Sequence, residues 1–179
     1  MNDFFAGLDV STQGQKIVVI DLQKNSVIYS DSINYDLDLP KYSTLNGIIK
    51  DTETGVSESN PKMWIDALHL IFERLKTSSD IIQSIKAISI AGQQHGLVAI
   101  DIDGNLAKPT SKLWNDFSTL EECEILTKEI GGFEQMIHSV ANSQRTGYTA
   151  SKIFHMYRNE KELYEKTDYF LLVHNYINW

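Results

Sequence analysis

The chain has 179 residues, 42% apolar side chains and a formal net charge of −8, which makes it the size of one domain with material for one good core. The negative charge argues against a nucleic-acid surface, which needs clustered Lys and Arg. With one cysteine, no apolar run near the roughly 20 residues that cross a bilayer, and no signal peptide, the sequence predicts a cytoplasmic protein without membrane or nucleic-acid partners.

Three strands are predicted at the amino terminus, because apolar and β-branched residues recur there between short turns. They cover residues 4–10, 16–22 and 26–34, and the short connections favour an antiparallel meander. The first turn, residues 11–15, is rich in hydroxyl and amide groups and lies beside Asp9. An Asp at a strand end can hold Mg²⁺ through water while such a turn contacts phosphate, although an ordinary polar hairpin fits the same residues. Neither a Gly-x-Gly-x-x-Gly nor a Gly-Lys-Ser/Thr loop occurs, which excludes Rossmann and P-loop sites.

Residues 36–60 carry few periodic apolar positions and many Asp, Ser, Thr and Gly, so we expect a long surface loop, of the kind that is functional or mobile. A helix is then expected to begin with Asn60 as its cap and Pro61 in its first position. Its apolar stripe consists of Trp64, Ala67, Leu68, Ile71 and Leu75. Trp64 fits two roles, a core residue or an aromatic surface for a ligand.

An apolar, β-branched run at residues 85–91 predicts a further strand. Two glycines, Gly92 and Gly96, then bracket three polar side chains. These are Gln93, Gln94 and His95. Because glycine tolerates positive φ and the close approach of other atoms, this arrangement suits the presentation of polar side chains to a small ligand. A polar turn between two strands fits the pattern equally well.

The next strand is predicted over residues 97–103, with a tight hairpin turn at Asp103-Gly104. Downstream, Trp114, Asn115 and Asp116 place an aromatic ring, an amide and a carboxylate in consecutive positions. Such a set suits a polyol, whose hydroxyl groups need both donors and acceptors. A buried Trp followed by a residue that caps a helix is the alternative interpretation.

Helices are predicted for much of the remaining chain. Ser118 and Glu121 form a capping box for a helix that runs to Ile130 and ends at a glycine pair. A shorter helix is expected over residues 133–140, and another begins near Lys152. Lys152 fits either a place near a ligand cleft or a solvated helix start.

The last part of the sequence combines a charged run with an apolar end. Residues 159–166 are most simply a solvated face. Residues 169–179 are apolar and aromatic, whereas natural termini are usually polar and frayed. We therefore expect the chain to be a truncated piece whose last residues need a neighbour.

Four segments, in order, resemble those of the FGGY carbohydrate kinases, most closely the xylulokinases. Residues 7–13, Gly-Leu-Asp-Val-Ser-Thr-Gln, resemble the first phosphate segment of the actin-like ATPases, except that Ser11 stands where Gly is usual. Residues 92–96 and 113–116 resemble the family's Gly-Gln-(Met or Gln)-His-Gly and Leu-Trp-Asn-Asp segments. Residues 145–152 resemble its Pro-Gly-Phe-Thr-Ala-Pro-Lys segment. Glycerol kinases carry Asn-Gln-Arg-Glu at the second of these places, so the resemblance favours the pentulose kinases.

The resemblance implies an α/β fold of the ribonuclease-H-like, actin-like ATPase class. Such a domain has a mixed sheet with an antiparallel meander at its amino terminus and flanking helices. All four matched segments belong to the first part of the first of two domains. Residues 1–179 are therefore expected to be the amino-terminal part of domain I of a larger kinase.

The resemblance also implies an enzyme that phosphorylates a ketopentose with ATP and Mg²⁺, with D-xylulose as the expected substrate and D-xylulose 5-phosphate as the product. Asp9 is then expected to hold Mg²⁺ through water and to position phosphate. The expected cofactor contacts are Ser11, Thr12, Gln13 and Lys16, and the expected sugar contacts are Trp64, Gln94, His95, Asn115 and Asp116. The family's catalytic base lies in a later Gly-Gly-Gly-Asp segment that these residues do not contain, so this chain alone is expected to be inactive.

Other functions stay open at this point. One is a non-catalytic sugar-sensing or partner-binding domain on an actin-like scaffold, and another is a kinase for a different sugar or polyol. A change in the configuration of one hydroxyl leaves no signature in motifs this short. A homodimer of the full-length enzyme is a further expectation.

Overall fold

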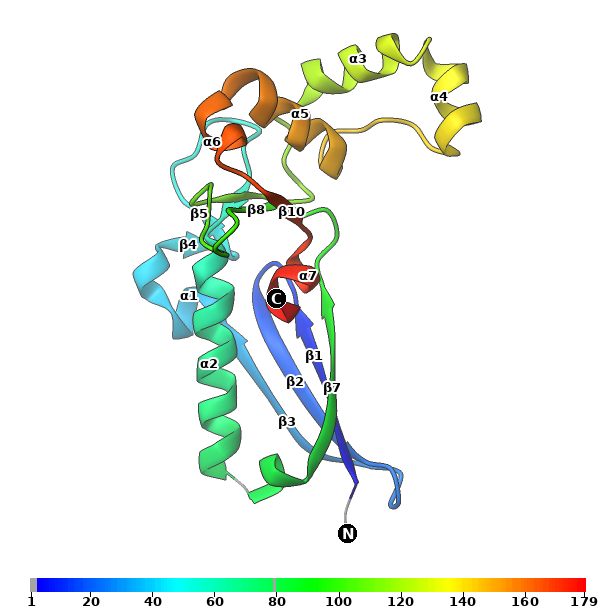
Figure 1. Ribbon diagram of the computed structural model, residues 1–179. Helices are drawn as coiled ribbons and strands as arrows, with labels where there is room; N and C mark the ends of the chain where they lie inside the picture. The colour runs from blue at the N-terminus through cyan, green and yellow to red at the C-terminus, as the bar shows by residue number, and fades with distance from the viewer. Residues whose placement is uncertain (1–2, 79) are drawn as a thin grey trace. The chain divides into compact units, whose positions relative to one another are not determined.

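The computed structural model describes residues 3–78 and 80–179, which form two compact units (Figure 1). The first unit contains the chain up to Lys50, Asn60–Gln93 and Val173–Trp179. The second contains Asp51–Ser59 and Gln94–Leu172. Among the described residues, no helix is long and apolar enough to cross a membrane.

A four-stranded mixed sheet organises the first unit. Its strands are β1 (Phe4–Val10), β2 (Gly14–Asp21), β3 (Ser26–Asn34) and β7 (Ile85–Gly92), in the order β3-β2-β1-β7. The first three pair antiparallel through short turns, which confirms the predicted meander. β7 pairs parallel with β1, so Val10 and Gly92 are register partners at the same end of the sheet. The chain segments that leave these two strands therefore begin side by side.

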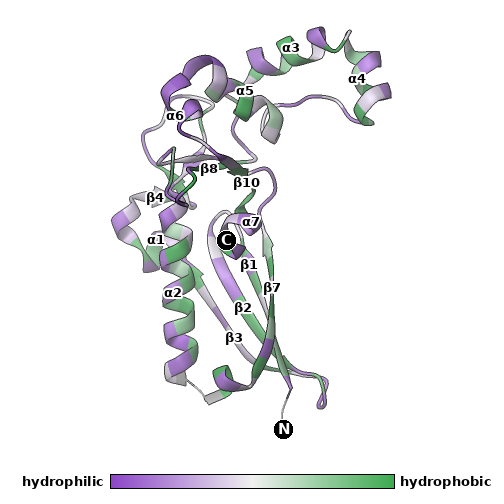
Figure 2. Cartoon of the chain, viewed as in Figure 1, coloured by the Kyte–Doolittle hydropathy of each residue, from purple (hydrophilic) through white to green (hydrophobic). Residues whose placement is uncertain are grey.

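Helix α2 (Pro61–Ser78) covers one face of this sheet by packing against β2 and β3. It begins as predicted, since the Asn60 side chain accepts a hydrogen bond from the Lys62 N–H at 2.9 Å. Figure 2 shows the apolar and polar residues along the helix and the strands. One side of the strands and one stripe of the helix make the core of the unit. Its buried members are Phe4, Ala6, Leu8, Val10, Ile17, Val19, Ile33, Met63, Trp64, Ala67, Ile71 and Leu75.

The predicted long loop after β3 contains several short elements. In the first unit they are α1 (Tyr35–Asp38), the 3-10 turn η1 (Pro40–Tyr42) and the antiparallel pair β4 (Thr44–Leu45) and β5 (Ile48–Ile49). The Asp36 carboxylate joins α1 to β4 and to the turn between β4 and β5. It accepts a hydrogen bond from Thr44 Oγ1 at 2.7 Å. The N–H groups of Asn46 and Gly47 donate to it at 2.6 and 3.1 Å. In a segment without apolar periodicity, one carboxylate thus fixes the turn between β4 and β5.

The second unit combines strand pairs with helices. β6 (Glu58–Ser59) pairs with β9 (Ser111–Lys112), and β8 (Val98–Ile100) pairs with β10 (Tyr169–Leu171), both antiparallel. The helices are α3 (Leu120–Glu129), α4 (Phe133–Val140), α5 (Thr149–Asn159) and α6 (Lys161–Glu165). The core of the unit includes the buried Leu97, Ala99, Ala107 and Met156, against which Ile153, Leu163, Tyr164 and Phe170 pack.

The capping box predicted for α3 is wrong. The helix begins at Leu120, and Thr119 precedes it without a side-chain cap. Ser118 instead donates its hydroxyl to Asp116 Oδ1 at 2.6 Å. The Ser118 oxygen, which would accept the capping hydrogen bond, instead accepts one from the Lys112 ammonium at 2.7 Å.

The apolar end of the chain is divided between the units. β10 belongs to the second unit, and α7 (Val173–Asn178) packs on β7 in the first. A Cβ atom on Gly92 would lie 2.9 Å from the His174 nitrogen. Gly92 is therefore needed for the close approach of α7 to β7. The 3-10 turn η2 (Asp80–Ser84) precedes β7 in the chain.

Candidate functional site

The turn between β1 and β2 gathers most of the predicted phosphate residues in the first unit. Asp9 and Lys16 are paired across the two strands, and both side chains are exposed. The Ser11 hydroxyl donates to Asp9 Oδ2 at 2.6 Å, and its N–H donates to the Gly14 carbonyl at 2.9 Å. Asp9, Ser11, Gln13 and Lys16 all line one open hollow of about 300 Å³. The structure thus brings a carboxylate, a hydroxyl, an amide and an ammonium group to one place.

Thr12 contacts Gln93, a member of the polar triplet that was not among the expected sugar or phosphate contacts. Its hydroxyl donates to Gln93 Oε1 at 3.0 Å, and the Gln93 N–H donates to the Val10 carbonyl at 2.9 Å. Gln93 Nε2 is buried and has no hydrogen-bond partner among the described residues. Gln93 therefore links the turn after β1 to the segment after β7. Its Nε2 group remains a hydrogen-bond donor. The parallel pairing of β1 with β7 is the signal that was missing from the sequence.

The substitution of Ser11 for the usual Gly costs no backbone strain here. Among the described residues, six that are not glycine have positive φ, and Ser11 is not one of them. The need for glycine falls on Gly47 instead, which has φ of 77°. A Cβ atom there would lie 1.9 Å from the Thr12 carbonyl oxygen. The backbone at Gly47 thus supports the phosphate turn by direct contact.

Trp64 does not match its predicted role as a ligand surface. Its side chain is 0% exposed in the core of the first unit. Its carbonyl accepts a hydrogen bond from Gln15 Nε2 at 2.6 Å, and Gln15, the second residue of β2, is itself buried. A ring with no exposed face cannot stack on a sugar, so the alternative interpretation, a core residue, is the one that the packing supports.

In the second unit, the first turn of α5 holds His95. The His95 ring stacks on Tyr148 with ring centroids 4.5 Å apart, and Nδ1 lies 3.5 Å from the Thr149 hydroxyl. The Lys152 ammonium donates to the His95 carbonyl at 2.5 Å. His95 itself has φ of 57°, whereas neither Gly92 nor Gly96 has positive φ. In this segment the left-handed backbone conformation, which was expected at a glycine, is therefore adopted by His95.

The surroundings of His95 favour the neutral form of its imidazole. Burial, with the nearby Lys152 charge as a second cause, lowers the pKa of His95 below its ordinary value. A neutral imidazole presents one N–H donor and one nitrogen acceptor. Gln94, the other predicted sugar residue of this segment, is exposed.

Lys152 is 0% exposed, so of the two alternatives for this residue the solvated helix start is excluded. Burial lowers the pKa of Lys152 to about 8, with Asp116 opposing the shift and Lys112 adding to it. Such a group cannot be a surface residue of the helix start. Lys152 lies between the His95 carbonyl and the buried charges of Asp116 and Lys112. It therefore belongs to the residues that hold the site in place.

Asp116 and Asn115 differ in whether their side-chain oxygens already have hydrogen-bond partners within the protein. Asp116 is 0% exposed and accepts hydrogen bonds from the Ser57 N–H at 2.8 Å and the Ser118 hydroxyl at 2.6 Å. The Lys112 ammonium lies 3.4 Å from its Oδ2. Both carboxylate oxygens are thus engaged within the protein, which contradicts a direct sugar contact for Asp116. Asn115 Oδ1, in contrast, is buried without a hydrogen-bond partner among the described residues.

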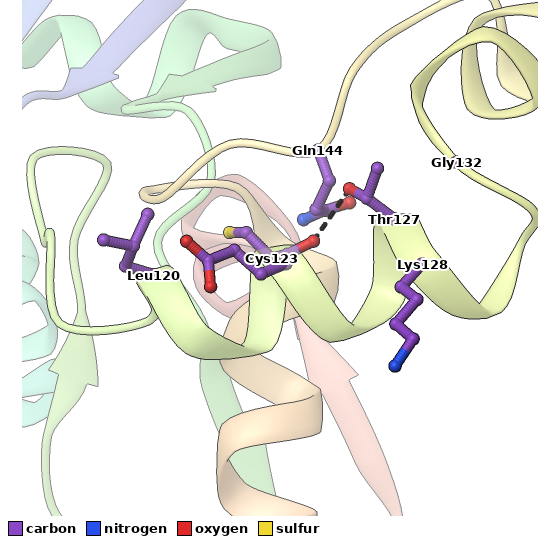
Figure 3. Close-up of a pocket in the computed structure, with 7 residues that line it drawn as sticks. Leu120, Cys123, Thr127, Lys128, Gly132 and Gln144 are labelled. Carbon is purple, nitrogen blue, oxygen red and sulfur yellow. Dashed lines mark hydrogen bonds between the residues drawn. The ribbon is translucent and has the colours of Figure 1, made fainter.

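A hollow of about 470 Å³ lies beside α3 (Figure 3). Its lining residues are Leu120, Cys123, Glu124, Thr127, Lys128, Gly132 and Gln144. Thr127 donates its hydroxyl to the Cys123 carbonyl at 2.8 Å, so this polar group is satisfied within the helix. Because the lining includes no predicted site residue, we treat this hollow as separate from the candidate site.

Solved structures share the fold of this chain. The α/β chain with its mixed sheet, antiparallel meander and parallel β7 has the actin-like ATPase fold of sugar kinases. A xyloylose kinase from Brucella ovis has a similar structure, with a TM-score of 0.82 and 24% identity, covering 98% of this chain and 33% of that one. A xylulose kinase from Rhodospirillum rubrum matches with a TM-score of 0.82 and 19% identity, again over 98% of this chain and 33% of that one.

The sequence then assigns the family. The N-terminal domain of the FGGY family of carbohydrate kinases matches residues 4–179, and the chain belongs to this family. The xylulose kinase of Schizosaccharomyces pombe is 36% identical over 192 residues, which cover 97% of this chain and 34% of that protein. The xylulose kinase of Haemophilus influenzae is 32% identical over 181 residues, covering 98% and 34%. The chain thus spans about a third of the length of these relatives.

Proposed function

We propose that the complete protein to which this chain belongs transfers phosphate from ATP to a ketopentose, and that D-xylulose is the substrate. The observation that carries the proposal is the environment of His95. Tyr148 and Thr149 hold the imidazole there within a Gly-Gln-Gln-His-Gly segment, and its neutral form, which burial favours, offers one donor and one acceptor to a sugar. The similarity to proteins named xylulose kinases supports the choice of sugar.

On the phosphate side, we assign ATP contacts to the turn after β1. The side-chain amide of Gln13 is a donor for phosphate oxygens and Lys16 supplies a positive charge, and both line the same hollow as Ser11. The residues assigned to ATP in this turn are Ser11, Thr12 and Gln13. In phosphoryl transfer, catalysis consists mostly of positioning and charge stabilisation, which is what such a turn supplies.

Asp9 fits a divalent cation by its donor chemistry. It is an exposed carboxylate, and Ser11 engages Oδ2 but leaves Oδ1 available. Among the described residues, no group of three or more His, Cys, Asp or Glu gathers to hold a metal. This agrees with Mg²⁺, which keeps several waters and is shared with the phosphates of ATP. When bound, the metal neutralises charge on the phosphates.

On the sugar side, we assign contacts to Gln94, His95 and Asn115. Asn115 is half-buried and its Oδ1 has no hydrogen-bond partner among the described residues, so it retains an acceptor for a sugar hydroxyl, and Gln94 is exposed and carries both donors and acceptors. Trp64 and Asp116 are assigned to packing and support. We place the catalytic base outside these 179 residues, since both oxygens of Asp116 are already engaged.

The test is a coupled assay of ADP release by the complete protein with Mg·ATP. We expect sugar-dependent turnover above about 1 s⁻¹ with D-xylulose, and lower kcat/KM with L-xylulose, D-ribulose, gluconate and glycerol. The 179-residue chain alone serves as a control and is expected to be inactive. Turnover with glycerol or gluconate but not with any ketopentose would refute the substrate class, and binding of D-xylulose without turnover would favour a sugar-sensing domain.

A further inference from the structure

One turn of helix supplies three contacts to His95, and they come from different chemical groups. Tyr148 stacks on the ring, the Thr149 hydroxyl approaches Nδ1, and Lys152 donates to the carbonyl. Residues at positions i, i+1 and i+4 of a helix start can reach one neighbouring segment, because i and i+4 lie on one face. The ring and the backbone of His95 are therefore fixed separately.

The backbone contact is the unusual one, because it requires a buried charge. A left-handed residue such as His95 is held against an unfavourable φ only when its surroundings determine it. Lys152 is fully buried, and burying an ammonium is costly unless its hydrogen bonds are made. Its bond to the His95 carbonyl spans 57 residues of sequence, so it ties the start of α5 to the end of the sugar segment. A side chain retained at such a cost has a specific role in the structure.

The charges around Lys152 are balanced within the second unit. Asp116 is the nearby carboxylate that favours its charged form, and Lys112 is the nearby cation that disfavours it. Lys112 is itself held between Asp116 Oδ2, at 3.4 Å, and Glu58 Oε1, at 3.6 Å. The carboxylate of Asp116 is therefore the counter-charge for two lysines, which explains why it is buried and engaged.

We infer that Lys152 is a positioning residue for the sugar site. It holds the His95 carbonyl and with it the left-handed backbone, so that Tyr148 and Thr149 can fix the orientation of the imidazole. Lys152 does not touch the substrate in this assignment. The statement that the imidazole so fixed binds a sugar rests on the function proposed above, whereas the contact between Lys152 and His95 does not.

The first experiment tests the contact without any sugar. In the 179-residue chain, NMR should show Lys152 ammonium protons that exchange with water at least tenfold more slowly than those of Lys161, an exposed lysine on α6. A nuclear Overhauser effect should join them to His95, and backbone couplings should report positive φ at His95. In Lys152→Met these couplings should change to those of an extended residue, while Lys161→Met leaves them unchanged. Fast exchange at Lys152, or unchanged couplings at His95 in Lys152→Met, would overturn the inference.

The second experiment measures the consequence in the complete protein. Lys152→Met should raise the KM for the sugar roughly 5- to 100-fold, as expected for a lost hydrogen-bonding group, and change the KM for ATP less than twofold. Lys152→Gln keeps a donor and should recover part of the loss, which a defect in folding alone would not predict. Equal rises in both KM values, or no recovery with Gln, would count against positioning. If the wild-type protein shows no sugar-dependent turnover, the proposed function fails, and the NMR result still decides the contact.

Discussion

The contact between the turn at Gly147 and the Trp-Asn-Asp segment allows a sharp prediction for the second unit. Gly147 has φ of 82°, and a Cβ atom added there would lie 2.0 Å from the Trp114 carbonyl oxygen. A left-handed backbone costs an L-residue about 1–2 kcal/mol. Cβ contacts under 3.0 Å are essentially never seen, so one backbone segment must also move by about 1 Å, and such overpacking costs about 1–3 kcal/mol. Gly147→Ala should therefore destabilise the chain by about 2–5 kcal/mol.

Gly55 is the matched control for this prediction. It lies in the same unit with φ of 86°, but a Cβ atom there would meet nothing closer than 3.9 Å. Gly55→Ala should cost only the backbone term, about 1–2 kcal/mol. Urea unfolding followed by circular dichroism and tryptophan fluorescence measures both free energies of unfolding. Equal losses in the two variants would show that the close approach at Trp114 is relieved without cost, and the reasoning would be refuted.

Three further predictions concern the proposed sites. In the complete protein, His95→Ala should raise the KM for the sugar roughly 5- to 100-fold because a sugar hydroxyl loses its partner. The KM for ATP should change little, and steady-state kinetics that move both constants together would contradict the assignment. Asp9→Asn should lower turnover at saturating ATP and Mg²⁺ far more than it weakens sugar binding, since phosphoryl transfer depends on positioning and charge; unchanged kcat would return Asp9 to the role of a turn residue. The free energy of unfolding should rise as the pH increases from about 8 towards 10.5, because the folded pKa of Lys152 is lowered and the unfolded chain binds more protons in that window. Denaturant titrations should show this rise in the wild type and lose it in Lys152→Met, and a rise of equal size in both would assign it to other groups.

Local features of the fold could be predicted from the sequence. The meander follows from alternating strands joined by short turns, and α2 follows from an Asn-Pro start with an apolar stripe. Both depend on residues within one or two turns of each other. The order and spacing of the four matched segments also pointed to the FGGY family, which the domain match confirms. Chemistry carried by consecutive residues can be recognised in the sequence alone.

Whether a polar side chain is available to a ligand depended on tertiary contacts. Trp64 and Asp116 satisfy their motifs, yet one is a core residue and the other has both oxygens engaged. Lys152 was ambiguous in the sequence because its partner, His95, is 57 positions away. Periodicity reports which face of an element is apolar, but it does not report what packs on that face.

The sequence by itself therefore determined the main strands and helices, the family and the list of candidate groups. The tertiary structure alone decided how these groups are used. It brought Thr12 within hydrogen-bond distance of Gln93, 81 positions away in the sequence, because β1 and β7 run parallel and end together. It made Gly47 rather than residue 11 the glycine on which the phosphate turn depends, since a backbone carbonyl approaches there too closely for a side chain. Such contacts depend on the three-dimensional path of the chain, and short motifs carry no record of it.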